Sequence, residues 1–295
     1  NYLKEAWDEG LIESPRIFSA GKCISQTAGH GDPSKGHYRL TPYRSPYDPA
    51  GIGCTADGSD EVRRLVRFNL SQNADFIKIC TSSGVHGNAN SLYRVEYSDD
   101  EVKAAVEAAK NYGTYVASHC VSNGGIKLAV RCGVRTIEHA SYLDPDGAKM
   151  MADNGCYLVS TYAVAWAALE NLEVYPPVMR QKFVESDRIH RETFAYALKE
   201  KVKIGYGTDF TAGGDHSREF ECLTELGMSP METIVAATKT GAEILCRDDL
   251  GTIEQGKLAD IIMVSGDPSR DIRILRNPGN IHVVMLGGKL YKNEF

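Results

Sequence analysis

The strongest constraint on the fold is a regular alternation that begins at residue 59. A charged amphipathic helical segment is followed by a short apolar or β-branched segment and a turn, and the pattern then repeats. Helices are predicted over residues 59–73, 98–113, 122–132, 144–154 and 178–200, and strands over 75–80, 114–118, 134–138, 157–161 and 202–208. Ser59 is predicted as an N-cap, and Ser98 with Glu101 has the capping-box spacing. Repeated βα units indicate a parallel sheet covered by helices.

Residues 16–19 (Arg-Ile-Phe-Ser) add one more strand candidate, which gives six strands that could be parallel. Since a (β/α) barrel closes with eight strands, the favoured fold is an α/β, TIM-like (β/α)8 barrel whose first two strands would precede residue 1. The alternative is an open doubly wound sheet, which six strands would satisfy.

The pattern changes in the last fifth of the chain. Two further helices are predicted over residues 217–227 and 230–245. After them, short apolar segments separated by Gly and Pro predict the strands of a small β-subdomain. The predicted organisation is an incomplete barrel domain over residues 1–248 and a C-terminal β-subdomain over residues 249–295.

Composition restricts the classes of partner. The 295 residues include 42% hydrophobic residues, enough for a sizeable core. A formal charge of −6 without a Lys- or Arg-rich run argues against nucleic acid and anionic membranes. No apolar run is long enough to cross a bilayer, and the first residues do not resemble a signal peptide. The eight cysteines show no C-x-x-C spacing, so a reducing, cytoplasmic location is expected.

Residues 29–58 form a long Gly-, Pro- and Tyr-rich stretch without periodicity, directly after a predicted strand. Loops of this length in a compact domain are usually functional or disordered. In a barrel, the loop would lie at the carboxyl ends of the strands, where barrel enzymes keep their active sites.

Four polar residues occur within or directly after predicted strands, among apolar neighbours: Lys78, His119, His139 and Asp209. A lysine in an apolar strand is costly unless it is paired, neutral or modified, and one modification is a carbamate formed with carbon dioxide. Imidazole nitrogens and carboxylate oxygens suit zinc, and an aspartate can also carry a proton. Together these residues predict a metal site at the mouth of the barrel.

Each of the four residues has an ordinary alternative when taken singly. His119 or His139 could be a hydrogen-bonded core histidine, Asp209 a helix N-cap, and Lys78 a side chain whose ammonium reaches solvent. Their joint occurrence at the ends of strands in one βα series favours the metal site.

The same residues carry a resemblance to a family. Lys78 in Phe-Ile-Lys-Ile, His119 in Ala-Ser-His, His139 in Thr-Ile-Glu-His-Ala and Asp209 in Gly-Thr-Asp resemble the ligands on strands 4, 5, 6 and 8 of the amidohydrolase superfamily. The segments 25–32 and 256–260 are similar to those of the branch that includes Xaa-Pro dipeptidases, related carboxypeptidases and the fungal ochratoxin-hydrolysing amidase.

The resemblance implies a mechanism and a set of roles. One or two divalent metal ions, with Zn²⁺ expected, would be held by Lys78, His119, His139 and Asp209, with Lys78 N6-carboxylated as a bridging ligand. Asp209 would act as the catalytic proton carrier. His30, in Gly-His-Gly-Asp, resembles the family's substrate-side histidine, with a turn-stabilising residue as the alternative. His216 is a second substrate-side candidate, with an exposed loop histidine as its alternative.

Two features depart from the family pattern. The His-x-His pair expected at the end of the first barrel strand is absent from the sequence, and truncation before residue 1 explains this better than a degenerate site. Many prolidase-like relatives have a tyrosine two residues after the strand 5 histidine, where this chain has Val121.

The predicted function is metal-dependent hydrolysis of a carbon–nitrogen bond, amide or dipeptide-like, in a small-molecule substrate with a free carboxylate, such as an Xaa-Pro dipeptide or an N-acyl amino acid. The alternatives are a catalytically impaired metal-binding fragment, or a cyclic-amide hydrolase or deaminase on the same fold. The resemblance also allows a homo-oligomer, although no segment marks an interface.

Overall fold

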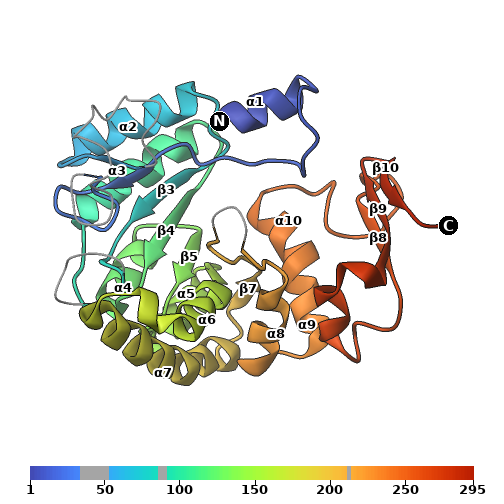
Figure 1. The fold of residues 1–295 in the computed structure, drawn as a ribbon. Helices are drawn as coiled ribbons and strands as arrows, with labels where there is room; N and C mark the ends of the chain where they lie inside the picture. The colour runs from blue at the N-terminus through green and yellow to red at the C-terminus, as the bar shows by residue number, and fades with distance from the viewer. Residues whose placement is uncertain (34–52, 86–91, 211–213) are drawn as a thin grey trace. The chain divides into compact units, whose positions relative to one another are not determined.

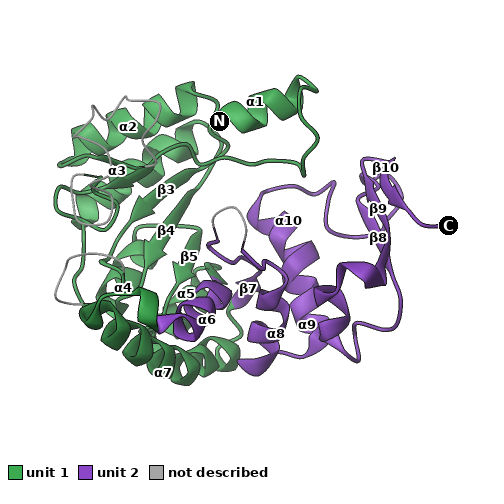
Figure 2. Cartoon of the chain, in the orientation of Figure 1, with its two compact units in different colours: residues 1–158, 173–202 green, residues 159–172, 203–295 purple. Residues whose placement is uncertain are grey.

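The computed structural model describes residues 1–33, 53–85, 92–210 and 214–295. Most of the long loop predicted over residues 29–58 therefore lies outside the described residues. The chain divides into two compact units, shown in Figure 2: unit 1 comprises residues 1–158 and 173–202, and unit 2 comprises residues 159–172 and 203–295. The boundary predicted at residue 248 stays a prediction.

Unit 1 is built around a sheet with the strand order β2-β1-β3-β4-β5-β6, of which Figure 1 labels β3, β4 and β5. The strands are β1 (Cys23–Ser25), β2 (Gly53–Thr55), β3 (Ile77–Cys80), β4 (Val116–Cys120), β5 (Thr136–His139) and β6 (Tyr157–Val159). β1 pairs in parallel with β2 and β3, and the pairs β3–β4 and β4–β5 are also parallel. Parallel pairing with a helix after most strands is the arrangement that the βα repeats predict.

Apart from the first, the helices described in unit 1 follow the predicted periodicity. They are α1 (Tyr2–Asp8), α2 (Ser59–Ser71), α3 (Asp99–Asn111), α4 (Asn123–Arg131), α5 (Pro145–Asp153) and α7 (Pro177–Lys199). In α2, Val62, Leu65, Val66 and Asn69 are buried at helical spacing. α2 packs on β1 and β3, and α3 lies beside α2 and packs on β4. These contacts bury the apolar face of each helix against the sheet.

The signals for helix starts were largely correct. Ser98 and Glu101 form the predicted capping box, and the Asp144 carboxylate accepts from the Gly147 amide at 2.6 Å. The prediction for Ser59 was wrong, because Ser59 is the first helical residue and Gly58, with φ of +79°, is the N-cap. Glycine reaches this backbone conformation without the steric cost of a Cβ.

The strand predicted over residues 16–19 is wrong, and β1 and β2 were missed. The Ser19 amide donates to the Asp75 carboxylate and the Asp75 amide donates to the Ser19 carbonyl, both at 2.7 Å. The Asp75 side chain thus accepts the hydrogen bond that a neighbouring strand's carbonyl would accept in a sheet. β1 and β2 have three residues each, too few for a periodic signal.

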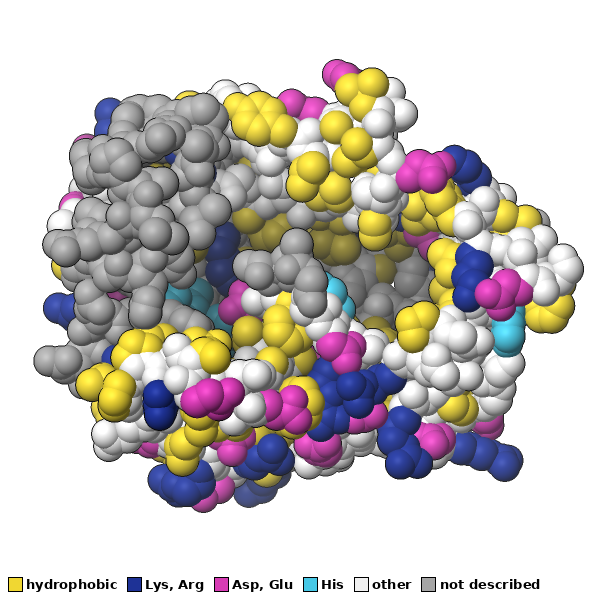
Figure 3. All heavy atoms as spheres, viewed as in Figure 1, with side chains coloured by type: hydrophobic (Ala, Val, Ile, Leu, Met, Phe, Trp, Pro, Cys, Tyr) yellow, Lys and Arg dark blue, Asp and Glu magenta, His cyan; other side chains and the backbone are white. Residues whose placement is uncertain are grey.

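The long helix α7 presents a charged surface. Arg188 pairs with Glu192 and Arg191 with Asp187, each four residues apart along the helix. Figure 3 shows lysine and arginine side chains mixed with aspartate and glutamate in the region of α7. Mixed pairs at this spacing add modestly to helix stability.

Unit 2 contains β7 (Lys203–Gly205), the helices α6 (Tyr162–Glu170), α8 (Arg218–Glu225), α9 (Pro230–Val235) and α10 (Gly241–Ile244), and a small antiparallel sheet. A π-helical turn over residues 236–240 joins α9 to α10, so the helix predicted over 230–245 is interrupted. The small sheet has the order β10-β9-β8, formed by β8 (Ile261–Val264), β9 (Ile281–Leu286) and β10 (Lys289–Asn293). These are the strands predicted for the C-terminal segment.

Helix α6 was not predicted. Its N-terminal amides, those of Tyr162 and Ala163, donate to the carboxyl group of Glu219 at 3.1 and 2.6 Å. Glu219 is fully buried, and burial raises its pKa well above the usual value. The cap is supplied by a residue more than 50 positions later, so the local sequence carries no start signal for this helix.

In the described part of the chain, no helix combines the length and apolar character needed to span a membrane. All eight cysteines lie among the described residues and are free thiols.

Candidate active site

Lys78 is the second residue of β3 and forms an ion pair with Glu138 of β5. The register places Lys78 beside Ala117, and Ala117 beside Thr136, so Glu138 lies one pleat further along the same face. The Thr136 hydroxyl also donates to Glu138, at 2.6 Å. Burial opposes the charge on Lys78, but the attraction and hydrogen bond of Glu138 outweigh it and raise the pKa of Lys78 above its ordinary value. The ion pair with Glu138 therefore favours the ammonium form of Lys78.

His119 is the fourth residue of β4, so this strand extends past residue 118, where the predicted strand ended. The His119 side chain is buried, with 7% exposure. Its side chain hydrogen-bonds to the backbone of Ser83, and its Nε2 is buried without a hydrogen-bond partner among the described residues. The bond to Ser83 is therefore made by Nδ1. Burial, followed by the neighbouring His30, His139 and Lys78, lowers the pKa of His119 well below its usual value. A neutral imidazole with one nitrogen anchored and the other available is the state that binds a metal ion.

His139 is the last residue of β5, and its φ of +76° ends the extended conformation. Ala140 follows with φ of +50°, so two consecutive non-glycine residues are left-handed. Such strain is costly and is found mainly where a site requires it. The His139 ring lies edge-on to the His119 ring, with centroids 4.7 Å apart.

His30 lies in the turn after β1, and its ring stacks on that of His119 with centroids 3.8 Å apart and planes 4° apart. The backbone of Gly84 lies close to the edges of both rings. A Cβ at position 84 would lie 2.5 Å from His30 Cε1 and 2.9 Å from His119 Cε1. Only glycine fits this contact without displacing a ring, so the sequence after β3 shapes the imidazole cluster of His30, His119 and His139.

Asp209 and His216 belong to unit 2. Asp209 lies four residues after β7, is exposed and has φ of +56°. It is not the N-cap of α8, which is Ser217. His216 Nδ1 and the Thr208 hydroxyl are hydrogen-bonded at 2.9 Å. β7 is shorter than the predicted strand 202–208, so Asp209 does not directly follow it.

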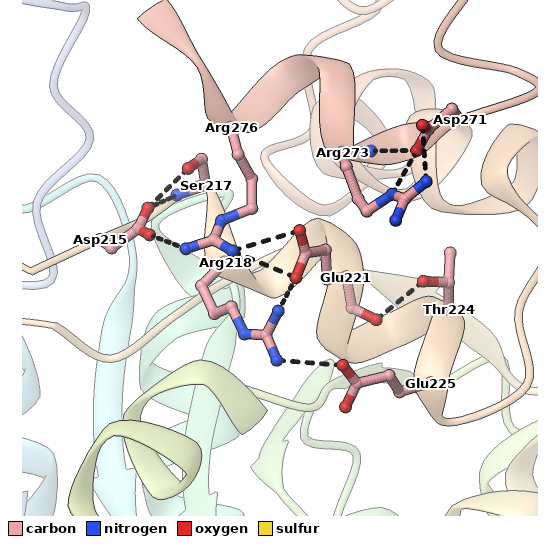
Figure 4. A network of polar contacts seen from close by, with 9 residues as sticks. All are labelled: Asp215, Ser217, Arg218, Glu221, Thr224, Glu225, Asp271, Arg273 and Arg276. Atoms are coloured by element: carbon pink, nitrogen blue, oxygen red, sulfur yellow. Dashed lines mark hydrogen bonds and ion pairs between the residues drawn. The ribbon is translucent and has the colours of Figure 1, made fainter. Parts of the chain in front are cut away.

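The segment that carries His216 is held by a network of ion pairs (Figure 4). Arg276 donates to Asp215 at 2.8 Å and to Glu221 at 3.2 Å, and Arg218 pairs with Glu221 and Glu225. The Tyr206 hydroxyl donates to the His216 carbonyl at 2.6 Å. Arg276, from the C-terminal segment, thus holds the first turn of α8 and the residue before His216.

The donor set of unit 1 suits a metal ion in part. His119 offers a neutral imidazole with an unpartnered buried nitrogen, and His139 lies beside it. However, no group of three or more His, Cys, Asp or Glu residues within the described ranges is arranged to hold a metal ion. Lys78, a nitrogen donor only when neutral and an oxygen donor only when carboxylated, is engaged by Glu138. The imidazoles fit the predicted metal, whereas Lys78 would have to leave Glu138 to contribute to the site.

Three residues that shape this site were not identified from the sequence: Glu138, Ser83 and Gly84. Glu138 could have been found from the alternation within β5, because Thr136 and Glu138 must share a face. Ser83 and Gly84 gave no signal, since they act through backbone atoms.

Comparisons with known proteins give the family. The sequence profile described as "Amidohydrolase family" matches residues 1–291. The chain is 33% identical to ochratoxinase of Aspergillus niger over 304 residues, covering 98% of this chain and 63% of that protein. The chain thus spans less than two thirds of the length of this relative.

Solved structures agree over nearly the whole chain. A Xaa-Pro dipeptidase with methionine bound in its active site is 36% identical, with a TM-score of 0.90, covering 99% of this chain and 72% of that one. The Aspergillus niger ochratoxinase structure is 30% identical, with a TM-score of 0.88, covering 99% and 69%. These likenesses confirm the predicted α/β, TIM-like hydrolase fold in preference to a doubly wound sheet. The chain belongs to the amidohydrolase family.

Proposed function

We propose that this chain carries the active site of a metal-dependent hydrolase that cleaves an amide or dipeptide-like carbon–nitrogen bond in a substrate with a free carboxylate. The proposed metal ligands are Lys78, His119, His139 and Asp209. His30 and His216 are the proposed substrate contacts. The assignment of Asp209 as a ligand is supported by its Gly-Thr-Asp motif alone.

The observation that carries the proposal is the state of His119. Its Nε2 is buried without a hydrogen-bond partner among the described residues, while its other ring nitrogen is held by Ser83. A buried polar atom left unpaired costs free energy, typically about 1–3 kcal/mol, and a metal ion would remove this cost. The depressed pKa of His119 supports the same role, because a protonated imidazole cannot bind a metal.

A divalent cation bound at these residues would lower the pKa of a coordinated water and polarise the scissile carbonyl. The protein side chains have separate tasks. Ser83 orients the His119 ring, and Asp209 would move a proton from the attacking water to the leaving amine at its carboxylate oxygens. Carboxylation would turn Lys78 from an ammonium into an oxygen donor, which requires that Glu138 first release it.

The substrate class rests on the substrate-side histidines and on the relatives. An imidazole N–H can donate to a substrate carboxylate or carbonyl. One of the relatives is named an ochratoxinase and another a Xaa-Pro dipeptidase. Zinc is the proposed metal because imidazole and oxygen ligands suit it.

The proposal is tested by supplying the chain with Zn²⁺ and bicarbonate and assaying Xaa-Pro dipeptides, N-acyl amino acids and lactams. We expect hydrolysis of at least one of the first two groups, and none after dialysis against a chelator. Turnover of lactams alone would instead support the cyclic-amide alternative.

Metal binding separates the proposal from the impaired-fragment alternative. We expect His119→Ala to lower zinc affinity about 10- to 100-fold, as loss of a ligand or its support does in other zinc sites. The matched control is His282→Ala, a histidine of the small sheet that pairs with Glu294. Zinc uptake that depends on His119 without turnover of any substrate supports the impaired fragment, and equal zinc affinity in both variants contradicts the metal site.

A further inference from the structure

Glu96 is a buried acid that none of the roles above uses. It is 1% exposed and lies in a segment that returns alongside the residues after β3. Ser82 and Val95 form an antiparallel bridge, and the Glu96 amide donates to the Thr81 carbonyl at 2.9 Å. The backbone of Glu96 is therefore fixed to the segment that leads to Ser83 and Gly84.

The side chain of Glu96 reaches the turn that carries His30. Its Oε2 accepts from the His30 amide at 2.9 Å and from the Ser25 hydroxyl at 3.4 Å. The Ser25 hydroxyl oxygen in turn accepts from the Gly31 amide at 3.1 Å. The backbone on both sides of the His30 Cα is thus held by one carboxyl group, directly and through Ser25.

The contact is tight enough to leave little freedom in the turn. A Cβ at position 29 would lie 2.6 Å from Glu96 Oε2 and 2.4 Å from Ser25 Oγ, so the turn approaches the acid closely only because Gly29 has no side chain. A side chain held by packing and hydrogen bonds keeps the groups that it supports near one geometry. The His30 ring that leaves this turn is the ring that stacks on His119.

We propose that Glu96 is a positioning residue that sets the His30 ring against His119 by holding the backbone of residues 30 and 31. It joins the turn after β1 to the segment after β3, the two segments that supply His30, Ser83 and Gly84. Its effect on the ring positions is independent of the activity proposed above. Its effect on substrate binding rests on that proposed function, through the contact assigned to His30.

The first test observes the rings directly. In the full chain with labelled histidines, Glu96→Ala should move the ring proton signals of His30 and His119 toward those of unstacked histidines, because each ring lies in the shielding region of the other. Glu96→Gln, which keeps an acceptor oxygen, should restore the wild-type signals. The signals of His190 and His282 should not move in either variant. Glu107→Ala, an exposed acid of α3, is the matched control and should leave all ring signals unchanged.

If Glu96→Ala does not fold, Glu96→Asp gives the same comparison, since the shorter side chain cannot reach the His30 amide. A folded Ala or Asp variant with unmoved His30 and His119 signals overturns the proposal. This result would not contradict the proposed hydrolase function. Conversely, absence of turnover in the wild type would not contradict the role of Glu96 in placing the His30 ring.

The second test is kinetic and uses whichever substrate the wild type hydrolyses. Loss of one hydrogen-bonded support of a substrate contact should raise KM about tenfold while kcat changes less than about threefold. Glu96→Gln should restore KM to near the wild-type value. A purely structural role would instead lower the active fraction, and thus kcat, with KM unchanged.

Discussion

The rings of His119 and His139 meet edge to face at 4.7 Å although the two residues are not neighbours in the sheet register. His119 pairs with Glu138, and His139 pairs with Cys120. A regular strand would direct Glu138 and His139 to opposite faces. The left-handed conformations of His139 and Ala140 end the alternation at this point, so Glu138 can hold Lys78 while His139 lies beside His119.

The absence of a side chain at Gly84 should be essential for the stack of His30 on His119. We expect Gly84→Ala to destabilise unit 1 by about 1–3 kcal/mol, as overpacking does in other cores, and to weaken zinc binding about tenfold. Urea unfolding and zinc titration measure the two effects. Gly241→Ala is the control, since its Cβ would meet only the Ala236 carbonyl at 3.7 Å. Equal zinc affinity in Gly84→Ala and the wild type would show that the stack does not prepare the metal site.

The ion pair between Lys78 and Glu138 competes with carboxylation of Lys78, because only the neutral amine reacts with carbon dioxide. In Glu138→Gln the largest attraction that raises the pKa of Lys78 is lost, so burial, which lowers this pKa, is opposed only by the smaller effects of Cys23 and Cys80. We therefore expect more carbamate on Lys78 in this variant than in the wild type when metal is absent. Carbon-13 NMR with labelled bicarbonate detects the carbamate.

Lys78→Met supplies the baseline for this experiment, since it has no amine at position 78. A carbamate signal that persists in Lys78→Met would assign the carbamate to another residue. The same low signal in Glu138→Gln and in the wild type would mean that Glu138 does not control the charge state of Lys78.

Part of the loss of stability in mild acid should come from a histidine in α7. Burial lowers the pKa of His190 from the usual 6.5 to about 4. The unfolded chain then binds a proton at a higher pH than the folded chain does, so the stability contributed by the neutral ring is complete above pH 6.5 and is lost toward pH 4. The loss should reach about 3 kcal/mol at pH 4.

Urea unfolding between pH 7 and pH 4 measures this effect, and His190→Gln should flatten the profile by that amount. His282→Gln, in the small sheet, should keep the wild-type slope. A His190→Gln profile as steep as that of the wild type would place the acid sensitivity elsewhere.

The sequence alone determined the class of the fold and most of its helices. Helical periodicity and cap residues are local properties, so α2, α3, α4, α5 and α7 were found to within two residues at each end. The strand β3 was found because its apolar run is flanked by turns, and the C-terminal strands because Gly and Pro separate them. The strand-end motifs were enough to indicate the family.

Only the tertiary structure decided which atoms meet. Helix α6 begins where Glu219 reaches it from a distant segment, and Lys78 pairs with Glu138 on another strand. The imidazole cluster depends on the left-handed backbone at His139, on the missing side chain of Gly84 and on the carboxyl group of Glu96. None of these contacts is local in sequence. Their geometry depends on register and backbone conformation, which residue type and spacing do not specify.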